Sequence, residues 1–124
     1  MTNYVWVGAL IVVALIWIIK SGPSLRRLVE QSIDKKDISP IVQAAKKMSE
    51  RKRSIFFQEA ITLLWNSWNR DLAALTIKEF AFLHPGESIV QYWMKQVMEI
   101  EPQTAKEFLD DEFLDNYYMP EVAA

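Results

Sequence analysis

The sequence predicts an all-α protein in which a single N-terminal transmembrane helix precedes a small helical domain. Three observations support this fold class. Residues 4–19 carry no charged side chain, apolar residues recur at helical spacing through the rest of the chain, and the 124 residues include only three Gly and five Pro. All-β folds need many more turn-forming residues, and a chain that is 51% hydrophobic is too apolar to be disordered.

The apolar run Tyr4–Ile19 is predicted to be a membrane anchor that occupies residues 1–22. As a helix this run extends about 24 Å, slightly less than the roughly 30 Å hydrocarbon layer of a bilayer. Aromatic rings near both ends and a terminal lysine suit the two membrane interfaces and compensate for the difference. These predicted interface residues are Tyr4, Trp6, Trp17 and Lys20.

The apolar run has two other interpretations. A cleaved signal peptide begins with basic residues and ends at a small-residue cleavage site, whereas Met1-Thr2-Asn3 has no charged side chain and Lys20-Ser21-Gly22-Pro23 follows the run. A buried core helix of this composition would need cover on every side. A retained anchor is therefore the favoured interpretation.

Charge is distributed unevenly along the chain, although the net charge is only −2. Residues 20–53 hold ten of the 14 Lys and Arg, whereas residues 54–124 hold 12 of the 16 Asp and Glu. The positive-inside rule predicts an N-terminus outside and a C-terminal domain in the cytoplasm, as for a protein of a bacterial inner membrane. The basic residues predicted to set this topology and to contact lipid headgroups are Arg26, Arg27, Lys46, Lys47, Arg51, Lys52 and Arg53. Nucleic-acid binding is the alternative, and the acidic remainder of the chain opposes it.

Residues 23–53 are predicted to form a basic helical neck. Gly22-Pro23 ends the anchor, and Ser24 is placed to cap a helix over residues 25–36. Ser39 followed by Pro40 is a typical start signal for a second helix.

Residues 54–124 are predicted to form a helical domain. Their apolar residues follow a helical period and are separated by stop signals such as His84-Pro85-Gly86 and Glu101-Pro102. The second helix is so apolar that it is expected to be covered on more than one face. The predicted helices are 54–68, a second that is capped by Asn69 or Asp71 and runs to residue 83, 87–100 and 103–118.

The first two of these helices resemble one tetratricopeptide (TPR) repeat over residues 54–87. The large, small and bulky positions of the repeat correspond to Phe57, Ala60, Ile61, Leu64, Ala73, Ile77, Phe80 and the closing Pro85. Ile61 and Trp68 depart from the pattern, because the family favours small residues or Gly there. The resemblance implies a TPR-like helical hairpin stack with a concave face that binds a peptide or protein, and no catalysis.

Aromatic and acidic residues of this domain are the candidates for partner binding, since exposed aromatic side chains often anchor protein interfaces. The alternatives are that the aromatic residues form the core and that the carboxylates form a solvated helix face. The candidates are Trp65, Trp68, Tyr92, Trp93, Phe108, Asp110, Asp111, Glu112, Tyr117 and Tyr118.

The residue inventory opposes catalysis and cofactor binding. The chain has no Cys and a single His, His84, which is expected to interact with the C-terminal end of its own helix. It contains no phosphate-binding loop, nucleophile elbow or triad motif. We therefore expect no enzyme activity, no metal and no cofactor.

The expected function is that of a membrane-anchored protein–protein interaction module, an adaptor or scaffold that holds a cytoplasmic partner at the membrane. An accessory subunit built into a larger membrane protein complex is the alternative. A holin-like or toxin membrane protein is a third interpretation.

Overall fold

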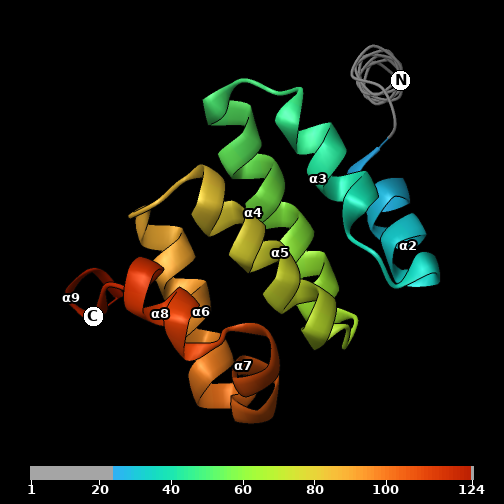
Figure 1. The fold of residues 1–124 in the computed structure, drawn as a ribbon. Coiled ribbons are helices and arrows are strands. Elements are labelled where there is room, and N and C mark those ends of the chain that lie inside the picture. Colours follow the sequence, from blue (N-terminus) through green and yellow to red (C-terminus); the bar gives the residue numbers. More distant parts are fainter. Residues whose placement is uncertain (1–23, 124) are drawn as a thin grey trace, which may run out of the picture.

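The computed structural model describes residues 24–123, and every element in this range is an α-helix (Figure 1). The all-α prediction is therefore confirmed for these residues. The helices are α2 (Leu25–Lys35), α3 (Ser39–Lys46), α4 (Glu50–Asn66), α5 (Arg70–Leu83), α6 (Ser88–Ile100), α7 (Pro102–Phe108), α8 (Asp111–Tyr117) and α9 (Pro120–Ala123).

The predicted anchor lies outside the described residues, as do its interface residues Tyr4, Trp6, Trp17 and Lys20. Within residues 24–123, no helix combines the length and the apolar character that crossing a membrane requires.

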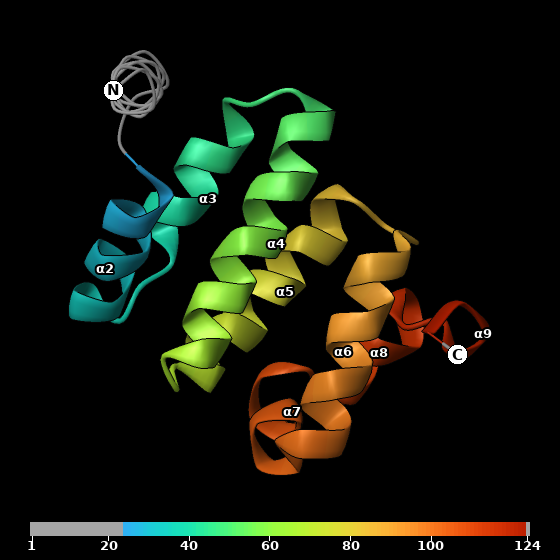
Figure 2. The same cartoon turned by 180° about the vertical axis from the view of Figure 1, so that it is seen from behind.

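The helices α4 and α5 form a central antiparallel hairpin, and the other elements pack on its two sides (Figures 1 and 2). On one side, α2 and α3 pack against each other and against α4. On the other side, α6 and α7 pack against α5, and α9 packs against α6. The two ends of the described chain therefore lie on opposite sides of the central hairpin.

The start of α2 follows the prediction. Ser24 has extended backbone and is the N-cap residue, and its hydroxyl oxygen accepts a hydrogen bond from the Arg27 amide at 3.3 Å. Leu28 and Val29 form the buried stripe of the helix. The helix ends at Lys36, whose left-handed backbone (φ 52°) directs its N–H to carbonyls of the last turn.

The turn into α3 depends on Asp37. Its carboxylate accepts hydrogen bonds from the Ser39 hydroxyl at 2.7 Å and from the Ser39 amide at 3.0 Å. These two bonds favour the ionised carboxylate and hold the pKa of Asp37 below the usual aspartate range. Ser39 is the first residue of α3 and Pro40 the second, one residue from the predicted start.

The helix α4 begins at Glu50 rather than at Ser54, so the predicted start was wrong. Ser49 is the N-cap residue, and the four polar residues that follow it extend the helix by one turn without adding to the apolar pattern. The Ser54 hydroxyl instead donates a hydrogen bond to the Glu87 carboxylate. As a result, α4 runs through the boundary between the predicted neck and the predicted domain.

Apolar packing between α4 and α5 forms the centre of the core. The rings of Phe57 and Phe80 stack with centroids 5.1 Å apart and planes 15° apart. All the α4 and α5 residues that carry the repeat resemblance are completely buried: Phe57, Ala60, Ile61, Leu64, Ala73, Ile77 and Phe80.

The C-terminal region differs from the prediction, because residues 103–118 form two helices and not one. The chain leaves the helical conformation at Leu109 (φ −111°, ψ 70°), and α8 starts after Asp110. Leu109 and Phe113 are both buried.

A buried glutamine fixes the end of this region. The Gln91 side chain, completely buried on α6, donates to the Tyr117 carbonyl at 2.9 Å and accepts from the Met119 amide at 2.6 Å. Both functional groups of the amide thus bind the backbone between α8 and α9.

Candidate protein-interaction surfaces

Six of the seven predicted lipid-contacting residues are exposed, and they lie at two places. The end of α3 and the start of α4 meet at one end of these helices (Figures 1 and 2); we call this region the basic end, and its members are Lys46, Lys47, Arg51 and Lys52. Arg26 and Arg27 lie apart from it at the start of α2, where the neighbouring Leu25 lines a groove with Gln58 and Leu63 of α4. Arg26 lies 4.0 Å from Glu30 in an exposed pair that contributes little to stability.

Arg53, the seventh residue, has a structural position. Its guanidinium is partly buried and donates to the Ala45 carbonyl at 3.0 Å and to the Met48 carbonyl at 2.9 Å. These carbonyls belong to the last turn of α3 and the residues after it, so Arg53 ties α4 to the end of α3.

A second surface joins the α4–α5 turn to α6. The Arg70 guanidinium lies 3.9 Å from the ring centroid of Trp65 and 4.3 Å from that of Trp68. It also forms an ion pair with Glu101 at 3.0 Å, in which both side chains are mostly buried. Trp93 packs against Trp65 with ring centroids 5.6 Å apart. We call these residues, together with Tyr92, the tryptophan–arginine surface.

The four aromatic residues predicted here are therefore brought together, with different exposures. Trp68 is 77% exposed and Tyr92 is 48% exposed, whereas Trp65 and Trp93 are partly buried against the core. Trp68 also has a left-handed backbone (φ 65°), a conformation that Gly adopts far more readily than Trp. Trp65 and Trp93 therefore contribute to the core, which was the alternative to partner binding, whereas Trp68 and Tyr92 do not.

A third surface is a pocket of about 260 Å³ between α5 and α8. Its floor is a cluster of three aromatic rings. Phe82 meets Phe113 edge-on at 5.6 Å and Tyr117 edge-on at 5.1 Å, and Phe113 stacks on Tyr117 at 5.1 Å. Phe82 is 43% exposed despite being apolar. We call this the aromatic–acidic pocket; its other lining residues are Lys78, Asp110, Glu112 and Asn116.

Three of the predicted partner-binding residues line this pocket, namely Asp110, Glu112 and Tyr117. Asp111 is exposed beside it at the start of α8. Phe108 and Tyr118 are partly buried against the core and do not line it.

Sequence reasoning missed the residues that complete these two surfaces: Lys78 and Phe82 in the pocket, and Arg70 and Glu101 on the tryptophan–arginine surface. Phe82 was expected to be covered because its helix is so apolar, but the ring faces solvent in part. For Lys78 and Arg70 a signal existed, since they are two of only four basic residues after position 53.

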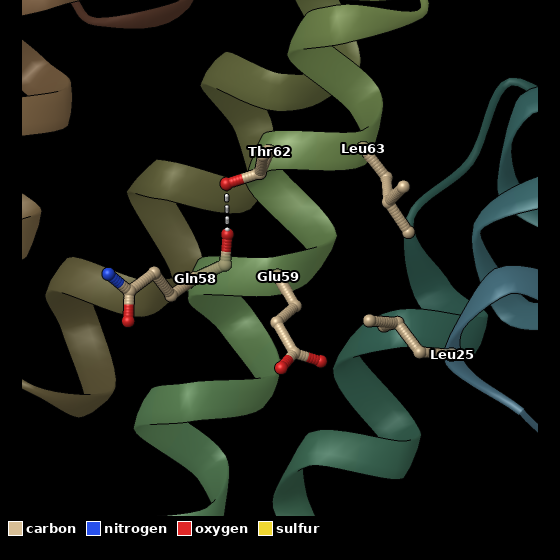
Figure 3. Close-up of a pocket in the computed structure, with 5 residues that line it drawn as sticks. All are labelled: Leu25, Gln58, Glu59, Thr62 and Leu63. Carbon is tan, nitrogen blue, oxygen red and sulfur yellow. Dashed lines mark hydrogen bonds between the residues drawn. The ribbon is translucent and has the colours of Figure 1, made fainter.

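An open groove of about 420 Å³ between α2 and α4 is a fourth feature (Figure 3). Leu25 of α2 and the α4 residues Glu59 and Leu63 extend into the space between the two helices. Gln58 and Thr62 complete the lining, and the Thr62 hydroxyl donates to the Gln58 carbonyl at 2.8 Å. The groove is apolar with one carboxylate, a combination that specifies no ligand class.

His84 is buried at the end of α5, with Nδ1 3.2 Å from the Glu87 carboxylate. Its ring also meets Phe80 edge-on at 5.4 Å. These contacts place the histidine in the structural framework at the α5–α6 turn.

No protein-family model matches the chain, and comparisons with characterised proteins and with solved structures also find no match. The functional argument therefore depends on the geometry and charge of these surfaces.

Proposed function

We propose that this chain is a membrane-anchored adaptor, in which residues 1–22 span the membrane and the helical domain holds a cytoplasmic protein partner beside it. It performs no catalysis in this proposal. The observation that carries the proposal is the separation of surface chemistry. The exposed bases lie on α2, α3 and the start of α4, on the side of the central hairpin where the described residues begin, whereas the aromatic and acidic surfaces lie on α4–α8, toward the other side of the hairpin.

The exposed bases support the membrane side of the proposal. Exposed bases next to a transmembrane segment favour the cytoplasmic side, and each contributes about 1 kcal/mol of attraction at an anionic membrane surface. Because six such residues lie on α2, the end of α3 and the start of α4, the attraction turns these helices toward the membrane as well as holding the domain near it.

The central hairpin supports the proposal of a TPR-like domain. Its repeat-like positions are buried between two antiparallel helices, as stacked helix pairs require. At Trp68, where TPR repeats favour small residues or Gly, the backbone is left-handed, a conformation that Gly adopts readily.

The exposed aromatic residues support the partner side. Trp, Tyr and Arg dominate binding energy at protein interfaces, and the tryptophan–arginine surface combines all three. A tethered domain presents such a surface at high local concentration, so that modest affinity is sufficient to keep a partner at the membrane.

The test compares the full-length chain with a chain that starts at Ser24, each carrying a photo-crosslinking phenylalanine analogue at Trp68 or at Phe82. The same analogue at Gln43, an exposed residue of α3, is the matched control. We expect a discrete crosslinked partner from Trp68 or Phe82 and none from Gln43. The adduct should resist carbonate extraction of membranes with the full-length chain and move to the soluble fraction with the shortened one.

Identical membrane retention of the two chains would contradict the anchor. Identical crosslinking from Gln43 would contradict a specific partner surface. Recovery of every copy in one large, detergent-stable assembly would instead identify the chain as an accessory subunit of a membrane complex.

A further inference from the structure

Resting on the adaptor function, we infer that the aromatic–acidic pocket between α5 and α8 is the docking site for a basic segment of the protein partner. A Lys or Arg side chain of that segment lies against the Phe82 and Tyr117 rings and pairs with Glu112. The pocket thereby selects the chemistry of the partner.

The floor of the pocket is suited to a cation. An ammonium or guanidinium group binds favourably over the face of an aromatic ring within about 6 Å of its centre. Phe82 keeps its ring partly open to solvent while Phe113 and Tyr117 contact it in edge-on geometry, and these contacts restrict the movement of the ring. A rigid, partly exposed aromatic side chain provides contact area at small entropic cost.

The rim of the pocket is acidic. Asp110 and Glu112 line it, and Asp111 and Asp115 are exposed next to them on the same helix. Against these four carboxylates the pocket holds one basic side chain, that of Lys78. Such an imbalance attracts a positively charged partner and accelerates its association.

Lys78 shows how the pocket holds a cation. Its ammonium lies 5.4 Å from the centroid of Phe113 and 3.6 Å from the Asp110 carboxylate. Asp110 occupies the N-cap position of α8, yet its side chain makes no capping hydrogen bond there. The Asp110 carboxylate thus pairs with the Lys78 ammonium and does not cap α8. Phe82 and Glu112 also line the pocket and are both exposed, so the pocket offers a second ring and a second carboxylate.

The other surfaces lack this specificity for charge. On the tryptophan–arginine surface, the position over the rings is already filled by Arg70, which is neutralised by Glu101. The groove between α2 and α4 offers one carboxylate and no aromatic ring. The aromatic–acidic pocket is the one of these three whose chemistry defines a partner.

The test measures binding of a fluorescent oligolysine peptide to the full-length chain in nanodiscs of zwitterionic lipid, by anisotropy. Zwitterionic lipid prevents the peptide from binding the membrane, and an oligoglutamate peptide of equal length is the ligand control. Phe82→Ala removes the exposed ring without changing charge, and Ile100→Ala, at an exposed apolar residue of α6, is its matched control. We expect Phe82→Ala to weaken binding by about fivefold and Ile100→Ala to leave it unchanged.

Lys78→Met provides a second, opposite readout. It removes the Lys78 ammonium and frees the exposed Asp110 carboxylate for the peptide, so we expect binding to strengthen by about threefold to tenfold. Lys106→Met changes the net charge equally at an exposed position of α7 outside the pocket and should alter binding by less than about twofold.

Equal effects of Lys78→Met and Lys106→Met, or of Phe82→Ala and Ile100→Ala, would show general charge attraction and overturn the pocket. No binding of oligolysine to the wild-type chain would overturn it as well. These results can be told apart from those of the adaptor test. If a partner is held at the membrane but peptide binding does not depend on the pocket, only this inference is overturned. If peptide binding depends on the pocket but no partner is held at the membrane, only the adaptor function is overturned.

Discussion

The α4–α5 hairpin and the C-terminal region from α7 to α9 are held in place by different kinds of contact. The hairpin consists of 17-residue and 14-residue helices joined by completely buried apolar side chains, including the stacked rings of Phe57 and Phe80. The C-terminal helices have only seven, seven and four residues, too few to be stable alone in water. Buried residues at a few points, together with the Gln91 hydrogen bonds, position them.

The difference bears on function, because the weakly held region carries most of the aromatic–acidic pocket. Elements with few buried contacts open at lower free energy than a packed core. A partner that binds α8 therefore binds a region whose position depends on a few contacts, among them the Gln91 hydrogen bonds. The hairpin supplies the rigid support, with Lys78 and Phe82 projecting from it.

Phe57→Ala should have the largest effect and should destabilise the whole domain. It removes a completely buried ring together with the stacking contact between that ring and Phe80. Such a substitution typically lowers the free energy of unfolding by ~3–5 kcal/mol. We expect urea unfolding of the detergent-solubilised chain to shift to lower concentration by circular dichroism, with loss of structure in all helices together. Retained hairpin structure at the wild-type midpoint would show that this pair is not central to the core.

Gln91→Ala should have a smaller and more local effect. It leaves the Tyr117 carbonyl and the Met119 amide without their side-chain partner, at a cost of ~1–3 kcal/mol. We expect hydrogen exchange to accelerate in residues 117–123 while α4 and α5 keep their protection. Gln103→Ala, at an exposed glutamine of α7, is the control. Equal acceleration in the hairpin would mean that the two regions open together and that the distinction between them is wrong.

Sequence reasoning was most successful where apolar periodicity and a stop signal coincide. The bounds of α5 and α6 agree with the predicted helices to within one residue, because His84-Pro85-Gly86 and Glu101-Pro102 interrupt the chain there. It failed at the start of α4, where the added turn is polar, and at Leu109, where the apolar spacing to Phe113 continues across the break between two helices.

The candidate surfaces were predicted only in part, for a different reason. The sequence shows which residues are acidic, aromatic or polar, but the residues that they contact are distant in sequence. Arg70 and Glu101 are separated by 31 positions, and Gln91 and Met119 by 28. Local patterns carry no information on which distant side chain fills a site. The tertiary arrangement alone reveals that Lys78 occupies the pocket and that Arg70 lies between two indole rings.

The smallest effect is expected in the turn between α2 and α3. This turn is held by hydrogen bonds to the exposed Asp37 carboxylate and not by buried side chains. Because the hydrogen bonds from Ser39 lower the pKa of Asp37, the ionised carboxylate stabilises the folded state above the pKa of an unfolded aspartate, about 3.9. This contribution disappears as the pH falls through the lower folded-state pKa. Asp37→Asn should therefore lower the urea midpoint slightly at neutral pH, and the difference from wild type should shrink toward pH 3. Asp34→Asn, an equal charge change at an exposed residue of α2, should show no such convergence. A gap that widens on acidification would mean that the Ser39 bonds do not favour the ionised form.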